Sequence, residues 1–237
     1  MNFLITICAR GGSKGLKEKN IKKINNIPLI KYTIDIAKLF SSKYNSVIAL
    51  STDSLKIKGL CESFGLNTEY IRPTRLGEDN IGKLDVIYDV LQYQEKKLKK
   101  NFDLILDLDV TSPLRNINDL DMALSLLNND SDALNIFSVN ESQRNPYFNM
   151  VEKKSNGYYG LVKDGAFLTR QSTPKVYDLN ASFYFFKRNF FNVGHKTTIS
   201  NKSLIYTMPH ICFDIDNQAD FDYMEYLLKN NKLNFKL

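Results

Sequence analysis

Residues 9–20 read ARGGSKGLKEKN, and they directly follow the mostly apolar run FLITIC at residues 3–8. A short apolar run of this kind predicts a buried strand. Glycine allows a sharp turn after the strand and lets backbone amides approach a ligand closely. Successive amides in such a turn form a concave anion site, and Arg10, Lys14 and Lys19 add positive charge around it. The segment therefore predicts a polyphosphate-binding loop, and the alternative is a basic loop that is merely solvated.

The spacing of the glycines excludes two familiar nucleotide-binding motifs. A P-loop needs G-x-x-x-x-G-K-[ST], but Gly15 is followed by Leu16. The dinucleotide-binding pattern G-x-G-x-x-G is absent as well. The loop therefore indicates neither a P-loop ATPase nor a dinucleotide-dependent dehydrogenase.

The composition narrows the class of protein. The chain has 237 residues, 43% of them hydrophobic, and a formal net charge of +6, which fits one large core and affinity for anions. No apolar run reaches the ~20 residues that span a bilayer, and we expect no signal peptide. The cysteines Cys8, Cys61 and Cys212 are far apart and odd in number, which favours free thiols in the cytoplasm.

The basic run at 96–100 lacks the interleaved aromatic residues of a nucleic-acid site, so we expect no nucleic-acid partner. Because no apolar run is long enough to span a bilayer, we expect no membrane partner either.

Strand and helix patterns alternate along the first 140 or so residues. The expected strands are 3–8, 46–51, 68–71, 103–108 and 132–138, and the expected helices are 28–40, 54–64, 83–98 and 117–128. This order predicts an α/β fold with a mostly parallel sheet between helices on both faces. Residues 141–180 break the pattern and predict an inserted lobe within a single domain, 1–237. Strands at 181–186 and 205–213 and a closing helix at 217–230 follow.

The glycine-rich loop is the first of a series of motifs that resemble the CMP-nonulosonic acid synthetases, the cytidylyltransferases that activate sialic, legionaminic and pseudaminic acids. The further matching segments are STD at 51–53, RP at 72–73, LGED at 76–79, TSPLR at 111–115, NPY at 145–147, RQ at 170–171, PKVY at 174–177 and FDID at 213–216. The resemblance implies a three-layer, Rossmann-like, Mg²⁺-dependent nucleotidyltransferase that joins CTP to a nonulosonic acid and releases pyrophosphate. It also implies a homodimer formed through the inserted lobe.

The resemblance gives the glycine-rich loop and the last motif separate roles. The residues expected to bind the triphosphate come from the loop: Arg10, Gly11, Gly12, Ser13, Lys14, Lys19 and Asn20. Arginine binds phosphate as a fork and lysine as a point charge, so Arg10, Lys14 and Lys19 are also catalytic candidates. Asp214 is the fourth, and with Asp216 it would bind Mg²⁺ through hard carboxylate oxygens. The alternative for Asp216 is that it caps the closing helix.

Further residues between the loop and the lobe are expected near the substrates. Arg72 would lie beside the nucleotide, or would instead stabilise a surface loop. Asp109 would assist the metal or bind a sugar hydroxyl, and Arg115 would line the sugar site; the alternative for both is an ion pair with each other. Asp53 ends an expected strand, where open α/β sheets bind ligands, or else caps the next helix.

The inserted lobe is expected to close over the acidic sugar with Arg170, Gln171 and Lys175. A carboxylated sugar needs a cation, and Arg170 is the expected partner of that carboxylate. We interpret both histidines, His195 and His210, as structural, because neither has an evident partner in the sequence. The sequence assigns no general base.

The chain departs from the family pattern at two places near the expected sugar pocket. Asp109-Val110 stands where relatives often have Gln-Pro, and residues 178–181 read DLNA where many have Arg-x-Asn-Gly. An inward-pointing Asp178 would disfavour an anionic sugar, so legionaminic acid or another relative is at least as well supported as N-acetylneuraminate. The rival hypotheses are a ketodeoxyoctonate-type synthetase, whose first motif runs closer to ARxxSxRLPGK, and a non-catalytic nucleotide-sugar-binding protein.

Overall fold

The computed structural model describes residues 1–12, 15–78 and 81–237, so Ser13, Lys14 and Asp79 lie outside the described residues. A six-stranded sheet forms the centre, in the order β10-β6-β9-β5-β1-β4. Its strands are β1 (Phe3–Cys8), β4 (Val47–Ser51), β5 (Leu104–Leu108), β6 (Asn135–Glu141), β9 (Tyr177–Lys187) and β10 (Ser203–Thr207). All of them except β9 run in the same direction. The predicted mostly parallel sheet is therefore confirmed.

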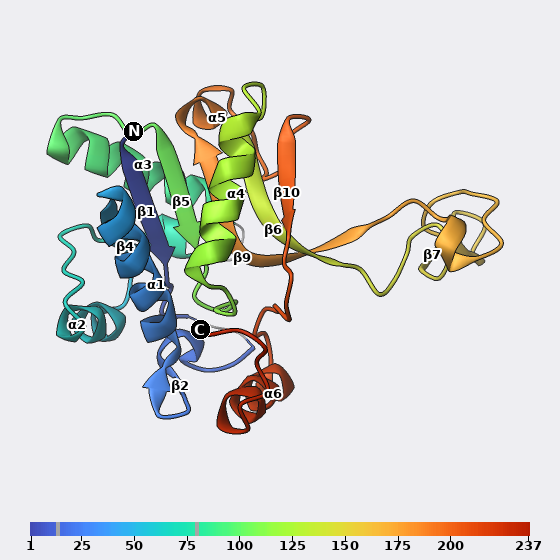
Figure 1. The fold of residues 1–237 in the computed structure, drawn as a ribbon, viewed down its shortest axis with the longest axis horizontal. Coiled ribbons are helices and arrows are strands. Elements are labelled where there is room, and N and C mark those ends of the chain that lie inside the picture. The colour runs from blue at the N-terminus through green and yellow to red at the C-terminus, as the bar shows by residue number, and fades with distance from the viewer. Residues whose placement is uncertain (13–14, 79–80) are drawn as a thin grey trace.

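Helices cover both faces of the sheet, with α1 and α4 on the side toward the viewer in Figure 1. The helices are α1 (Leu29–Tyr44), α2 (Leu55–Ser63), α3 (Lys83–Leu98), α4 (Ile117–Asn129), α5 (Arg188–Asn192) and α6 (Gln218–Lys229). Short 3₁₀ turns are η1 (Lys19–Ile21), η2 (Thr74–Gly77) and η3 (Arg170–Ser172), and small hairpins are β2 (Lys23–Ile24) with β3 (Ile27–Pro28) and β7 (Val151–Lys153) with β8 (Tyr159–Leu161). The predicted long helices are all present, with small shifts at their ends. Within the described ranges, no helix is long and apolar enough to cross a bilayer.

Two apolar clusters hold the layers together, one on each face of the sheet. Alternate residues of β1 point to opposite faces, so Ile5 and Ile7 join the cluster under α1, α2 and α4, while Leu4 joins the cluster under α3 and α5. The polar exception on the α3 face is Thr6, whose hydroxyl donates to the buried Asp107 carboxylate at 2.7 Å. This pair lies in β1 and β5, just below the carboxyl ends of both strands.

Two of the predicted strands are wrong or too long. Residues 68–71 are extended, with Thr68 and Tyr70 buried and their neighbours exposed, but these described residues join no strand of the sheet. The alternation of burial therefore imitates a strand without its ladder of hydrogen bonds. The predicted strand 205–213 ends at Thr207, two residues before Pro209, which cannot donate a ladder hydrogen bond.

Residues 142–176 project from the sheet as a separate lobe on a narrow stalk (Figure 1). The stalk is the far end of the β6–β9 pair, where Val139 opposes Leu179 and Glu141 opposes Tyr177. The pair is irregular between Phe137 and Val139, and opposite that point Ala181 has a φ of 58°. A left-handed conformation disfavours residues with a side chain, so the sheet turns into the stalk through a strained residue.

Candidate active site

A pocket of about 570 Å³ opens at the carboxyl ends of β1 and β5. The chain passes from β1 to β4 on one side and then to β5 on the other. Ligands of open α/β sheets bind at such a switch of strand order. Most of the expected motifs in the body of the protein, meaning the chain outside the lobe, contribute to this pocket, but the STD segment at 51–53 does not. The lining residues are Cys8, Arg10, Gly15, Lys19, Asn20, Arg72, Leu76, Glu78, Ile81, Lys83, Val86, Asp109, Thr111 and Asp216.

Asp53 holds the glycine-rich loop in place. The sequence left two roles open for this residue, binding a ligand or capping the next helix. The Asp53 carboxylate accepts a hydrogen bond from the Gly11 amide at 2.7 Å, and the cap of α2 is Ser54 instead. The Gly11 amide is therefore engaged inside the protein, while a side chain added to Gly12 would meet open space. The loop also packs closely at Gly15, where an added Cβ would lie 2.4 Å from the backbone oxygen of Asp216.

The loop and the last motif meet at the pocket mouth. The Lys19 ammonium lies 3.1 Å from the Asp216 carboxylate, and the Asn20 side chain donates to the Arg10 carbonyl at 2.9 Å. Asn217 caps α6, accepting from Ala219 and Asp220. The capping alternative for Asp216 is therefore wrong, and its exposed carboxylate faces the loop cations.

Asp214 lies deeper than Asp216, on the other side of the buried Ile215. The Ile215 amide donates to the Thr111 carbonyl at 2.8 Å, which ties this segment to the end of β5. One Asp214 carboxylate oxygen, Oδ1, is buried and finds no hydrogen-bond partner within the described residues. Burial, and then the negative field of Asp109, raise the pKa of Asp214. The positive charge of Lys19 acts in the opposite direction but more weakly.

The chemistry of this pair of carboxylates suits a hard cation. Oxygen ligands are what Mg²⁺ prefers, and it usually takes one or two protein carboxylates together with waters and phosphate oxygens. The described ranges contain no group of three or more acidic, histidine or cysteine side chains that could enclose a metal. The residues therefore fit a metal shared with a phosphate substrate better than a metal held by protein alone.

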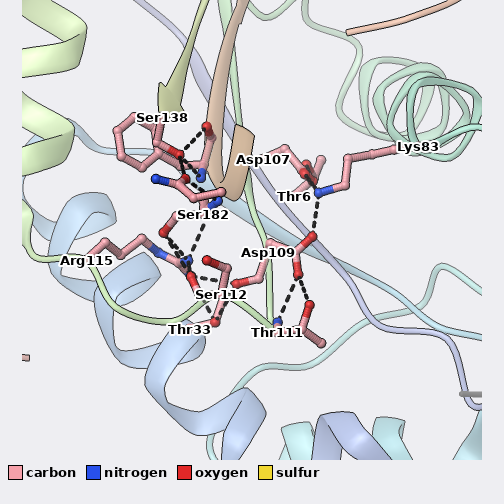
Figure 2. Close-up of polar contacts among 12 residues, drawn as sticks. Thr6, Thr33, Lys83, Asp107, Asp109, Thr111, Ser112, Arg115, Ser138 and Ser182 are labelled. Carbon is pink, nitrogen blue, oxygen red and sulfur yellow. Dashed lines mark hydrogen bonds and ion pairs between the residues drawn. The ribbon is translucent and has the colours of Figure 1, made fainter. Parts of the chain in front are cut away.

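Asp109 is bound on both of its oxygens (Figure 2). Lys83 donates to Oδ2 at 2.5 Å, and the amide and hydroxyl of Thr111 donate to Oδ1 at 2.9 and 2.8 Å. Burial alone would raise the pKa of Asp109, but the Lys83 ammonium and the Thr111 hydrogen bonds hold it at about 2. Its partner is thus Lys83, and the expected ion pair between Asp109 and Arg115 is wrong.

Arg115 lies beneath the pocket, at the left of Figure 2, with 1% of its surface exposed. Its guanidinium donates to the carbonyls of Ser112, Ser182 and Asp109 and to the Thr33 hydroxyl, at 2.7–2.9 Å. These contacts join α1, β9 and the turn after β5. Arg115 does not line the pocket, and the structure places it as a brace under Asp109.

Arg72 lines the pocket but is also held from within. Its guanidinium donates to the Ser51 hydroxyl at 2.9 Å and to the Ser51 carbonyl at 2.8 Å, and the residue is 5% exposed. This arginine therefore fixes the end of β4 and presents a buried positive charge to the pocket.

The structure does not bring the lobe residues to this pocket in the same chain. Arg170, Gln171 and Lys175 line a second cavity of about 470 Å³ in the lobe, which projects away from the sheet (Figure 1). The Arg170 guanidinium donates to the Ser142 carbonyl at 3.2 Å, and Lys175 lies 3.5 Å from Glu141. These polar groups form a separate surface.

Sequence reasoning missed two polar residues. His210 was expected to lack a partner, but its ring nitrogen lies 2.9 Å from the Asp119 carboxylate, and its ring stacks on Phe235. Burial opposes the charged ring, but the hydrogen bonds to Asp119 and to the Ile211 carbonyl, together with the negative charge of Asp119, raise the pKa of His210. Lys83 was not singled out either, although a lysine at a helix start is an unusual placement against the helix dipole.

Comparison with known proteins fixes the family. A model of the cytidylyltransferase family matches residues 4–236. The chain belongs to this family. It is 40% identical over 235 residues to post-translational flagellin modification protein B of Campylobacter coli, covering 99% of this chain and 98% of that protein. It is also 40% identical over 234 residues to CMP-N,N'-diacetyllegionaminic acid synthase of Campylobacter jejuni, with the same coverage.

Solved cytidylyltransferases share the fold. A CMP:2-keto-3-deoxy-manno-octonic acid synthetase complexed with CTP superposes with a TM-score of 0.69 at 14% identity, covering 98% of this chain and 100% of that one. At this identity the likeness describes architecture alone. The resemblance to CMP-nonulosonic acid synthetases and the α/β nucleotidyltransferase fold are both confirmed.

Proposed function

We propose that this cytidylyltransferase transfers CMP from CTP to the anomeric hydroxyl of a nonulosonic acid. In this reaction the hydroxyl oxygen forms a bond to the α-phosphorus and loses its proton to the surrounding water, the bond from that phosphorus to the bridging oxygen breaks, and pyrophosphate leaves. The observation that carries the proposal is the pocket at β1 and β5, which Arg10 and Lys19 line and where the Lys19 ammonium faces the Asp216 carboxylate. A 40% identical relative is named for the legionaminic substrate, so we propose a sugar of that type.

The glycine-rich loop is proposed to bind the triphosphate. Phosphoryl transfer depends mainly on positioning and on neutralising phosphate oxygens. Arg10 and Lys19 line the pocket, and the outward-facing Gly12 leaves space for a ligand. Lys14 and Ser13 belong to the same proposal, although both lie outside the described residues.

Asp214 and Asp216 are proposed to hold Mg²⁺. The support is the buried oxygen of Asp214, which has no hydrogen-bond partner within the described residues, and the exposed carboxylate of Asp216 two residues further along the chain. Bound there, Mg²⁺ would supply neutralisation of charge on the phosphate oxygens. On binding, we expect Lys19 to exchange its Asp216 contact for a phosphate oxygen, since both are anionic acceptors.

The sugar is proposed to bind between the body of one protomer and the lobe of another. The lobe offers donors and cations suited to a carboxylate, namely Arg170, Gln171 and Lys175. These residues lie away from the pocket of their own chain. The lobe also exposes large apolar side chains, among them Tyr158, Tyr159 and Leu168, which favours contact with a second copy. A homodimer would satisfy both observations. We expect the reaction in the cytoplasm, where free thiols such as those of this chain persist.

Pyrophosphate release tests the proposal directly. The protein is incubated with CTP and Mg²⁺ against legionaminic, N-acetylneuraminic and pseudaminic acids and ketodeoxyoctonate. We expect release with a legionaminic-type sugar and little with ketodeoxyoctonate. Release with ketodeoxyoctonate alone would favour the rival synthetase. Tight CTP binding with no release for any sugar would favour the non-catalytic alternative.

A further inference from the structure

Lys83 lines this pocket and faces two carboxylates at once (Figure 2). Its ammonium lies 2.5 Å from Asp109 and 3.2 Å from Asp107, and 4.9 Å from the centre of the Tyr184 ring. Asp107 is almost fully buried and Asp109 is 17% exposed, whereas 27% of the Lys83 side chain is exposed. The ammonium therefore stands between two carboxylates and the pocket.

The position of Lys83 is costly without these partners. It is the first residue of α3, where the helix dipole disfavours a cation. The paired carboxylates explain why a lysine is kept there. The group of three still carries one excess negative charge, because two carboxylates face one ammonium.

The excess negative charge of this group is unfavourable for the substrates proposed to bind in the pocket. On the proposed function, on which this inference rests, the pocket receives a nucleoside triphosphate and an acidic sugar. Unneutralised carboxylates at the end of β5 would repel both, and repulsion is strong where water is excluded. A counter-ion is needed beside the substrates even if it never touches them.

We propose that Lys83 is a positioning residue whose ammonium reduces the negative charge that Asp107 and Asp109 present, so that the pocket accepts a polyanion. Lys83 acts through the two aspartates, and its effect depends on the net charge of the group. Asp109 in turn is held by Thr111 from one side and by Arg115, through the Asp109 carbonyl, from below. The Thr111 hydrogen bonds to Oδ1 therefore still favour this position of the carboxylate when the ammonium is removed.

A series of charge variants tests this role. Lys83→Met adds one net negative charge to the group, Asp109→Asn removes one, and Lys83→Met combined with Asp109→Asn restores the original charge. The dissociation constant of CTP is measured by calorimetry with Mg²⁺ and without a sugar. We expect Lys83→Met to weaken CTP binding at least about 30-fold, the scale of a broken buried charge pair. We expect the double variant to return to within a few-fold of the original protein and Asp109→Asn to bind as tightly or more tightly.

Controls separate charge from folding and from the proposed function. Lys43→Met removes an equal charge from an ion pair with Asp121 on the outer surface, and it is expected to leave CTP affinity unchanged. Urea unfolding of each variant shows whether loss of affinity follows loss of structure. A double variant as weak as Lys83→Met would overturn the counter-ion role and indicate direct contact, and full affinity in Lys83→Met would overturn it as well. If the unmodified protein prefers ATP to CTP, the proposed function fails, and the same charge series is read with ATP.

Discussion

Two arginines that both belong to motifs of the family lie in different regions of this molecule, Arg115 in the body and Arg170 in the lobe. Arg115, in the body, is 1% exposed and binds four different residues. Arg170, in the lobe, is exposed and donates to the Ser142 carbonyl. The guanidinium of Arg115 is used to build the site, and that of Arg170 is accessible to an anion. The difference shows that a motif marks the neighbourhood of a site without saying which of its residues meet the substrate.

Asp214→Asn gives the largest expected effect and tests the body side of the comparison. We expect turnover to fall on the order of 10³-fold, because the proposed metal site would supply several kcal/mol of charge stabilisation. CTP affinity should change much less, and Asp216→Asn should show the same pattern more weakly. Turnover is measured as pyrophosphate release over a Mg²⁺ titration, with Asp222→Asn on the neighbouring α6 as control. Unchanged turnover in both site variants would refute the metal assignment.

Arg115→Met tests whether this arginine is structural. We expect it to lower the free energy of unfolding by about 3 kcal/mol, because several buried carbonyls lose their donor. Arg170→Met should change the same quantity by less than about 0.5 kcal/mol, as exposed substitutions do. Urea denaturation of the two variants gives the comparison. Equal stability of the two would mean that Arg115 does not brace the end of β5.

Arg170→Ala tests whether the lobe cation binds the sugar. We expect KM for the sugar to rise about 10- to 100-fold, the scale of a charged hydrogen bond, with KM for CTP nearly unchanged. Lys163→Ala, elsewhere in the lobe, is the matched control, since its side chain lies over Tyr147 and outside the lobe cavity. A rise in KM for CTP alone would mean that Arg170 binds the nucleotide rather than the sugar. The contrast between Arg115 as a structural residue and Arg170 as a sugar-binding residue would then fail.

Ala181→Gly gives the smallest expected effect and tests the junction between the two regions. Ala181 has a φ of 58° where the sheet turns into the stalk, and glycine adopts this conformation without strain. We expect the free energy of unfolding to rise by about 0.5–1 kcal/mol from the released strain. The entropy that glycine adds to the unfolded chain offsets part of this gain. Thermal unfolding measures the gain, and Ala166→Gly in the lobe is the control. A loss of stability would show that the junction is not strained.

The parts of the fold that follow local rules were predictable. The buried strand β1 and the glycine-rich loop are coded by adjacent residues, and α3 was predicted at its observed bounds because its apolar period is regular. Residues 68–71 misled the prediction, because their alternating burial comes from packing beside β4 rather than from a ladder. Such pairing is a property of the assembled sheet.

The site was predictable as a set of motifs but not as a set of contacts. Lys19 of the loop and Asp216 of the last motif, two residues that the family pattern singled out, lie in contact. The partnership of Lys83 with Asp109 spans 26 residues, and that of His210 with Asp119 spans 91. No local pattern encodes these pairs, because each depends on which helix and strand lie together in the finished fold.

Mixing two inactive variants tests the central claim that the body of one protomer and the lobe of another form one active site. Asp214→Asn disables the body side, and Arg170→Ala disables the lobe side when the sugar is supplied far below its raised KM. Random exchange makes half of the dimers mixed, each with one intact site, so we predict recovery of about a quarter of the original activity. The measurement is pyrophosphate release after unfolding and refolding the two variants together, with each variant refolded alone as reference. Activity no greater than the sum of the separate variants would contradict a shared site.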